Sequence, residues 1–292
     1  MNRILLILAM LAVAISAAGA AIGSKADGDP EAWTVYTETA DLHTTHSLTS
    51  TISGQIMRGT RAAGELLVDP ETDIEWLKVD ADGEIAFLRR SAIHRVHPRN
   101  IVQGNLPYGT EVVNRWWGVP LDYEPDDLVE VPTEFSNNSR DGYRLRSEAR
   151  DALVAMLTAA KGESGVGIVV ASAYRSGPTQ INIYGRNTRR APAQRFSAPP
   201  GHSEHQLGTT LDLTDPEGRH LFSRTYDRTD GGAWLENNGA RFGFVRSYYP
   251  RNEAETGYIS EPWHWRYVGR KKAGTAEKTG TTKKTDNAVS GK

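Results

Sequence analysis

Short alternating runs of apolar and polar residues fill the region 31–97. Turn signals separate these runs at Ser53-Gly54, Asp69-Pro70 and Asp82-Gly83, and each run has the roughly four to eight residues typical of a strand. The runs are WTVYTE, ISGQIMRG, RAAGELLV, EWLKVD and GEIAFLRR. Short strands at this spacing predict a small all-β barrel or sandwich.

A helical period begins at residue 145. In LRSEARDALVAMLTAAKG (145–162) the apolar residues recur at steps of three and four, which places them on one face of a helix. These residues are Leu145, Ala149, Leu153, Met156, Leu157 and Ala160. We expect Ser147 to cap the start of this helix, and Gly162 and Gly165 to end it.

The segments around this helix show weaker patterns. Residues 98–140 are rich in proline, tryptophan and acidic residues and indicate an irregular lead-in. GIVVASAY (167–174) is a nearly continuous apolar run and predicts a central strand that is buried on both faces. A second helix is expected to begin in 179–186, followed by a loop rich in arginine and proline over 187–202.

The two ends of the chain differ from the rest. Residues 1–20 have the charged, apolar and small-residue regions of a secretory signal peptide, which predicts an exported protein of the periplasm or cell wall. The apolar run from Ile4 to Ile15 is short for a membrane span, although a retained membrane anchor is the alternative. Residues 21–30 look like a linker, and the Lys-rich tail 271–292 is predicted to be disordered because it has few apolar side chains. No later segment is apolar enough to cross a bilayer.

Composition narrows the possible partners and ligands. The 292 residues carry a formal net charge of −2, which gives no electrostatic reason to expect a nucleic-acid partner. The chain contains no cysteine, so disulfides, a cysteine nucleophile and thiolate metal ligands are all excluded. Any metal ion must therefore be bound by histidine, aspartate or glutamate.

Those residue types gather in GHSEHQLGTTLDLTD (201–215). In one extended strand, His205 and Asp212 would lie about 23 Å apart. The chain must therefore reverse between them if both are to bind one ion, and Gly208 tolerates the positive φ that a reversal requires. After this turn, TTLDLT alternates, so its leucines point to one side of a strand and Asp212 points to the other.

A third ligand is expected from EPWHWRYVG (261–269). His264 completes the three protein ligands of a typical catalytic zinc site, whose fourth position is open to water. Glu261 lies close to His264 in the sequence and can act as the general base for that water. The residues therefore predict a Zn²⁺ site with His205, Asp212 and His264 as ligands.

Two patterns occur together in the second half of the chain. They are S-x-H-x-x-G-x-x-x-D from Ser203 to Asp212, and E-P-W-H-x-R-Y-V-G from Glu261 to Gly269. This combination resembles the VanY-like zinc D-alanyl-D-alanine carboxypeptidases of the hedgehog-type (LAS) metallopeptidase superfamily. Further similar segments extend the resemblance through 106–269; they are YEPDDLV (123–129), the S-x-Y-R-S of 172–176 and GFVRSYYP (243–250).

The resemblance implies an α+β peptidase domain over 98–270, with a small antiparallel sheet and flanking helices. It implies hydrolysis of the C-terminal D-alanyl-D-alanine bond of peptidoglycan stem peptides, with release of D-alanine and with Glu261 as the base. Arg175 would bind the peptide's terminal carboxylate or stabilise the oxyanion. Ser203 and Gln180 would be further substrate contacts.

A looser likeness covers 31–97, which resembles bacterial SH3-like domains. The matching positions are Gly54, Gly59-Thr60, Trp76, Lys78-Val79, Gly83 and Phe87-Leu88. Such domains often hold wall hydrolases to wall polymers, so the resemblance implies a small all-β SH3-like barrel that binds a wall polymer. The alternative is a structural barrel without a ligand.

Other functions stay open at this stage. The peptidase could instead be a D-Ala-D-Ala dipeptidase or a peptidoglycan endopeptidase, or the chain could be a catalytically silent wall-binding module. The presence of Glu261 favours catalysis, because structure alone does not require a base there. A serine-type enzyme would need S-x-x-K, which does not occur. His202 and His220 are not expected to be ligands.

Overall fold

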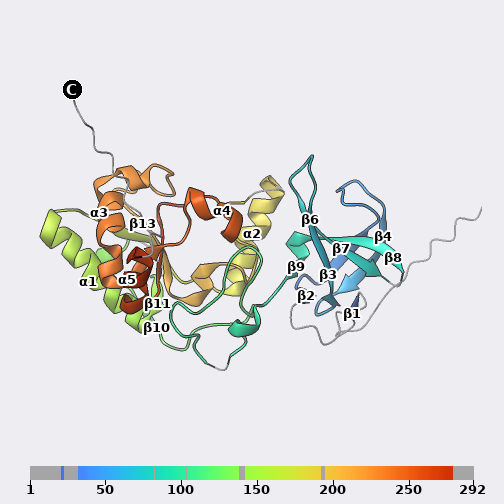
Figure 1. Cartoon of the computed structure of the whole chain (residues 1–292), viewed down its shortest axis with the longest axis horizontal. Helices are drawn as coiled ribbons and strands as arrows, with labels where there is room; N and C mark the ends of the chain where they lie inside the picture. Colours follow the sequence, from blue (N-terminus) through green and yellow to red (C-terminus); the bar gives the residue numbers. More distant parts are fainter. Residues whose placement is uncertain are drawn as a thin grey trace, which may run out of the picture. The chain divides into compact units, whose positions relative to one another are not determined.

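The computed structural model describes residues 21–22, 32–81, 83–102, 104–137, 142–191 and 195–278. The chain forms two compact units (Figure 1). Unit 1 comprises residues 1–98 with 184–194, and unit 2 comprises residues 99–183 with 195–292. The predicted signal peptide 1–20 lies outside the described residues.

Unit 1 is built on a five-stranded antiparallel sheet with the strand order β4-β3-β8-β7-β6. The strands are β3 (Thr39–His43), β4 (Ile52–Met57), β6 (Gly64–Val68), β7 (Glu75–Ala81) and β8 (Glu84–Arg89). Leu77 and Leu88 of neighbouring strands lie opposite each other in the apolar core. Between β7 and β8, Gly83 adopts a φ of 90°, and its N–H donates to Asp80 Oδ1 at 2.7 Å.

A second, smaller sheet of unit 1 has the order β1-β5-β2-β9. Its strands are β1 (Ala21–Ile22), β2 (Trp33–Val35), β5 (Arg61–Ala62) and β9 (Ile93–His94). The expectation of a linker over 21–30 is wrong at its start, because β1 pairs with β5 and Ile22 is only 2% exposed within the core. Residues 23–30 lie outside the described part of the chain.

Each run that the alternating pattern predicted contains a strand, but the pattern missed β3 and β9. RAAGELLV (61–68) holds two strands, β5 and β6, which belong to different sheets. The missed strand β3 does alternate, with Ala40 and Leu42 buried between polar residues, but its last residue, His43, is also buried beside the Trp76 ring.

Unit 2 contains a four-stranded antiparallel sheet with the order β12-β13-β15-β14. The strands are β12 (Val169–Ser172), β13 (Thr210–Thr214), β14 (Phe244–Arg246) and β15 (His264–Tyr267). The expected central position of β12 is wrong, because it lies at an edge. Val169 and Val170 are nevertheless buried, whereas Ala171 is partly exposed. At the outer edge of β12, Ser136 bridges to Val170 and Asn137 N–H donates to the Val170 carbonyl at 3.0 Å.

Helix α1 (Ser147–Ser164) covers this core with the apolar face that its sequence period predicts. Leu153 and Met156 are fully buried and belong to the same cluster as Leu211 and Leu213 of β13. Gly165 ends the helix in the left-handed region, with a φ of 68°. The N-cap, however, is Arg146 rather than Ser147, and it makes no side-chain capping bond.

Unit 2 contains further helices besides α1. They are α3 (Asp230–Asn238), α4 (Glu253–Thr256) and α5 (Arg270–Lys278), and a longer helix, α2 (Gly177–Arg190), starts in unit 2. The expected loop over 187–202 therefore begins later, because α2 continues to Arg190. The expected irregular lead-in holds one short strand, β10 (Leu128–Glu130), which pairs with β11 (Arg144–Arg146).

The Lys-rich tail is helical where it begins, which corrects the prediction of disorder from residue 271. Ala273 lies fully buried in α5, and its N–H donates to the Gly269 carbonyl at 3.0 Å, so this turn is held against the domain. Residues 279–292 lie outside the described residues. Within the described ranges, no helix combines the length and apolarity needed to span a membrane. The expected mixed fold with small antiparallel sheets and few helices is confirmed.

Candidate metal centre and active site

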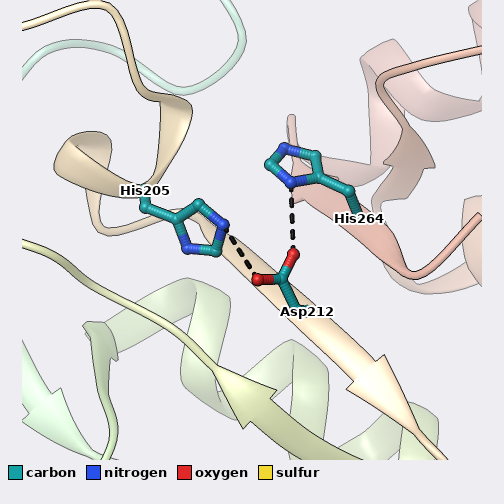
Figure 2. A group of neighbouring side chains, drawn as sticks. All are labelled: His205, Asp212 and His264. Carbon is teal, nitrogen blue, oxygen red and sulfur yellow. Dashed lines mark ion pairs between the residues drawn. The ribbon is translucent and has the colours of Figure 1, made fainter. Parts of the chain in front are cut away.

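His205, Asp212 and His264 come together in unit 2 from three separate elements (Figure 2). His205 lies on the 3-10 turn Glu204–Leu207, Asp212 lies on β13, and His264 is the first residue of β15. Asp212 and His264 are direct partners in the antiparallel register of β13 and β15. The sheet therefore sets two of the three side chains opposite each other, and the turn before β13 supplies the third.

Gly208 makes the chain reversal between His205 and β13 possible. It ends the 3-10 turn with a φ of 68°, a conformation that residues with a side chain rarely adopt. A Cβ at this position would also lie 2.8 Å from the Leu128 side chain, which is too close for an unstrained contact. The backbone conformation therefore favours glycine here, and any side chain would also have to displace the end of the Leu128 side chain.

The potential ligand atoms of the three residues lie within 4.8 Å of one another. His205 Nε2 is 3.3 Å from Asp212 Oδ2, and His264 Nδ1 is 3.2 Å from Asp212 Oδ1. All three side chains are almost completely buried, with residue exposures of 1%, 4% and 3% in sequence order. In Figure 2 both imidazole rings point toward the single carboxylate.

Two buried atoms of this group have no hydrogen-bond partner among the described residues. His205 Nδ1 donates to the Ala173 carbonyl at 2.7 Å, so Nε2 carries the lone pair that faces Asp212. Within the described part of the chain, neither His205 Nε2 nor Asp212 Oδ1 makes a hydrogen bond of acceptable geometry, although both atoms are buried. Buried polar atoms without partners are costly, and a cation between them would satisfy both. The three residues therefore fit a metal ion.

The electrostatics of the three side chains also favour a cation. Burial by itself would raise the pKa of Asp212, but the adjacent His205 and His264 hold it well below its usual range, so Asp212 is ionised. Burial, followed by Arg175, lowers the pKa of His205 to about 4, so its ring is neutral as a ligand must be. Burial opposes protonation of His264, yet the neighbouring carboxylates of Asp212 and Glu204 raise its pKa to about 10. An ion at Nδ1 of His264 must therefore displace a proton.

Glu261 lies beside the three residues, with Oε2 at 3.6 Å from His264 Nδ1. Its backbone N–H donates to the Tyr248 carbonyl at 3.1 Å, which fixes it just before β15. Burial raises its pKa to about 7, and Asp212 adds to this rise while His264 and Arg175 oppose it. A carboxyl group with such a pKa can accept and return a proton near neutral pH.

Arg175 follows β12 and is tied to the site through its backbone, whose N–H donates to the His205 carbonyl at 3.2 Å. Its guanidinium interacts electrostatically with Asp212 and Glu261. Its Nε is buried and has no hydrogen-bond partner among the described residues. Arg175 is therefore a cation at the edge of the site with donor capacity to spare.

The two other predicted substrate contacts have local roles in the structure. Ser203 precedes the 3-10 turn, and its Oγ accepts the His205 N–H at 3.4 Å. Gln180 is 1% exposed and donates from Nε2 to the Ala198 carbonyl at 2.7 Å. His202 and His220 lie outside the three-residue group: His202 Nδ1 contacts the Asn114 carbonyl, and His220 pairs with Asp215.

The sequence patterns missed Glu204, which contacts His264 on the side away from Asp212. Glu204 Oε2 is 2.9 Å from His264 Nε2, and Oε1 accepts from Arg266 Nη1 at 2.7 Å. Burial alone would raise the pKa of Glu204, but Arg266 and His264 lower it to about 2. The only sequence signal for this contact was the alternation of β15, which places Arg266 on the same side as His264. That alternation did not identify Glu204 as the partner of either residue.

The fold and this geometry agree with the comparisons to known proteins. Residues 142–270 match the family model "VanY: D-alanyl-D-alanine carboxypeptidase". The solved structure of the LdcB LD-carboxypeptidase is 34% identical, with a TM-score of 0.53, over 57% of this chain and 79% of that chain. The chain belongs to the VanY family.

Two curated relatives of this VanY-family chain extend the comparison. The putative carboxypeptidase YodJ of Bacillus subtilis (strain 168) is 37% identical over 166 residues, which are 56% of this chain and 60% of that protein. A D-alanyl-D-alanine carboxypeptidase of Enterococcus faecalis is 35% identical over 170 residues, which are 54% of this chain and 58% of that protein. The chain therefore spans about three fifths of the length of these relatives.

Proposed function

We propose that this VanY-family chain is a zinc-dependent carboxypeptidase that hydrolyses the terminal D-alanyl-D-alanine bond of peptidoglycan stem peptides and releases D-alanine. The observation that carries the proposal is the buried group of two imidazoles and one carboxylate, with the Glu261 carboxyl beside it. The family match supports the same substrate class.

Zinc is the metal that best suits the donor set. Two neutral imidazole nitrogens and one carboxylate oxygen, with no thiolate, are a common ligand set of catalytic zinc and leave one position open. When bound, zinc supplies positive charge that polarises the scissile carbonyl and makes the attacking water more acidic. His205, Asp212 and His264 would hold it.

Glu261 and Arg175 then have separate tasks. Glu261, with a pKa raised to about 7 mainly by burial, takes a proton from the attacking water and returns it to the leaving amine. Arg175 offers positive charge and a free Nε donor beside Asp212 and Glu261, where it binds the terminal carboxylate of the peptide or the developing oxyanion. Ser203 and Gln180 would be further substrate contacts.

A second activity is favoured by one specific comparison. The similar LdcB protein is an LD-carboxypeptidase, so removal of D-alanine from a tetrapeptide stem across an L,D bond is the main alternative. The dipeptidase and endopeptidase alternatives require a free dipeptide or an internal bond as substrate. All four use the same catalytic group and differ only in the peptide that reaches it.

Product analysis on defined peptides tests the proposal. The zinc-loaded chain is incubated with a pentapeptide stem ending in D-Ala-D-Ala, a tetrapeptide stem, free D-Ala-D-Ala and a cross-linked dimer, and products are measured by mass spectrometry. We expect D-alanine release from the pentapeptide, its loss with a chelator, and its recovery with added zinc. If only one of the other three substrates is cleaved, the assignment of D,D-carboxypeptidase activity is replaced by the corresponding activity. If none of the four is cleaved, the result favours a catalytically silent wall-binding module.

We also propose that residues 1–20 direct export and that residues 31–97 form an SH3-like domain that binds a wall polymer. The antiparallel strands of unit 1 support this proposal, as does the wall substrate of the family. The exported chain should begin near residue 21 when its N-terminus is sequenced. A turnover-deficient Glu261→Gln chain should co-sediment with purified wall sacculi, and a failure to do so would contradict the binding role.

A further inference from the structure

His264 lies between two carboxylates, each of which contacts one of its ring nitrogens. Nδ1 is 3.2 Å from Asp212 Oδ1, and Nε2 is 2.9 Å from Glu204 Oε2. An ionised carboxylate can only accept, so Nε2 donates its hydrogen to Glu204. Once Nδ1 loses its proton, its lone pair is directed at Asp212, where the proposed ion would lie.

The two histidines are supported in different ways. His205 donates from Nδ1 to the neutral backbone carbonyl of Ala173 at 2.7 Å. His264 instead donates to a full negative charge on Glu204, which lies next to His205 in the chain. A carboxylate partner increases the basicity of an imidazole ligand more than a neutral carbonyl does.

Glu204 is itself held firmly in place. It is 5% exposed, Oε2 also accepts from Ser247 Oγ at 2.5 Å, and Oε1 accepts from Arg266 Nη1 at 2.7 Å. Arg266 in turn donates to Glu111 Oε2 at 2.8 Å. The result is a buried chain of alternating charge, Glu111–Arg266–Glu204, that ends on His264 and leaves Glu204 little freedom to move.

We propose that Glu204 is a positioning residue for the metal site: it sets the ring orientation and tautomer of His264 and strengthens this ligand. The proposal rests on the proposed zinc-peptidase function. Its chemistry is the carboxylate–imidazole–metal arrangement, in which loss of the outer carboxylate typically costs about 10–100-fold in metal affinity. Arg266 and Ser247 hold Glu204 in position for this task.

A purely structural role for Glu204 predicts a different behaviour. If Glu204 served only to neutralise buried Arg266, its replacement would destabilise the fold but leave zinc affinity unchanged in the folded protein. Glu111 offers a matched comparison, because it pairs with the other terminal nitrogen of the same guanidinium and, within the described residues, is not among the carboxylates that contact His264. Metal affinity therefore separates the two roles.

The test compares Glu204→Gln with Glu111→Gln in the full chain. Zinc affinity is measured by chelator competition, and the visible spectrum of the Co²⁺-loaded protein reports the ligand geometry. We expect Glu204→Gln to bind zinc about 10–100-fold more weakly with an altered Co²⁺ spectrum. Glu111→Gln should keep both properties near those of the wild type.

Unchanged zinc affinity and Co²⁺ spectrum in Glu204→Gln would overturn the proposal, as would an equal loss in both variants. Should Glu204→Gln fail to fold, Glu204→Asp serves in its place, because it keeps the charge for Arg266 but draws the carboxylate away from His264. The same loss of affinity is expected. If the wild-type chain binds no zinc, both the proposed function and this inference are overturned. If the wild type binds zinc tightly and the Glu204 variant binds it equally well, only the inference is overturned.

Discussion

The edge strands of the five-stranded sheet in unit 1 and the central strands of the sheet in unit 2 differ in exposure. In unit 1, strands β4 and β6 are largely exposed, with side chains such as Ile52 and Val68 about half accessible. In unit 2, every residue of β13 and β15 is buried. A strand buried on both faces usually consists of apolar residues throughout. β13 and β15 instead carry polar side chains inside, among them Asp212 and His264.

This difference explains where the chemistry can lie. In β13, Leu211 and Leu213 pack into the apolar core, so the alternation of the strand turns Asp212 to the opposite, enclosed side. A charged group can remain enclosed only if partners compensate for its lost hydration. The core of unit 1 is mainly apolar, whereas the centre of unit 2 encloses charged groups that a bound ion would complete.

Asp212→Ala is expected to have the largest effect on zinc binding, and it tests the contrast between the cores of the two units. This change removes the carboxylate that both imidazoles face, so zinc affinity should fall well beyond the roughly 10–100-fold cost of losing an outer partner. Peptidase activity should be lost with it. The measurement is chelator competition in the folded protein. Asp215→Asn, three positions further along but outside the metal group, should bind zinc like the wild type.

Replacement of the base is expected to have the next largest effect. Glu261→Gln removes the proton acceptor while leaving His205, Asp212 and His264 in place, so kcat should fall about 10²–10⁴-fold. Metal analysis should find about the same bound zinc as in the wild type. Glu255→Gln, an exposed glutamate of α4, is the control and should keep its activity. Loss of zinc from Glu261→Gln would make Glu261 a ligand instead.

A core substitution in unit 1 should lower the stability of the fold without changing zinc affinity. Leu77 is fully buried between neighbouring strands, so Leu77→Ala should lower the free energy of unfolding by about 2–5 kcal/mol. Denaturant unfolding measures this change, and zinc affinity should stay the same. Leu66→Ala, at the partly buried partner position on β6, should cost less. A marked loss of zinc affinity in Leu77→Ala would contradict the separation between the two units.

The smallest effect concerns a charge outside the metal group. Burial would raise the pKa of Asp215, but N–H groups of Arg219 and His220 and the His220 ring hold it at about 2. Because this pKa is lower than the unfolded value, the ionised form stabilises the fold above about pH 4. That stabilisation, at most about 2 kcal/mol, is lost as pH falls toward 2.

Asp215→Asn should therefore be less stable than the wild type at pH 6, and the gap should shrink on acidification to pH 2. Thermal or denaturant unfolding across this range measures it. Glu217→Gln is the control, because Glu217 is 60% exposed in its pair with Arg219 and should contribute little. A gap between Asp215→Asn and the wild type that stayed constant from pH 6 to pH 2 would contradict this account.

Local patterns were sufficient for much of the fold. The three-and-four spacing predicted the face of α1, and alternation predicted most strands of unit 1, because burial of one face imposes a period on the residues themselves. The patterns could not predict that β12 lies at the sheet edge, because Val169 and Val170 are buried like the residues of a central strand. They also missed that Ala273 anchors the start of the Lys-rich tail.

The sequence by itself determined which residue types could form the site: two histidines and an aspartate with a glycine at the reversal, in a chain without cysteine. These are local requirements of ligand chemistry and backbone conformation. Only the tertiary structure decided that Glu204 faces His264, through a contact between residues 60 positions apart. Pairing across such a distance depends on how turn and strand pack together, and no local period records it.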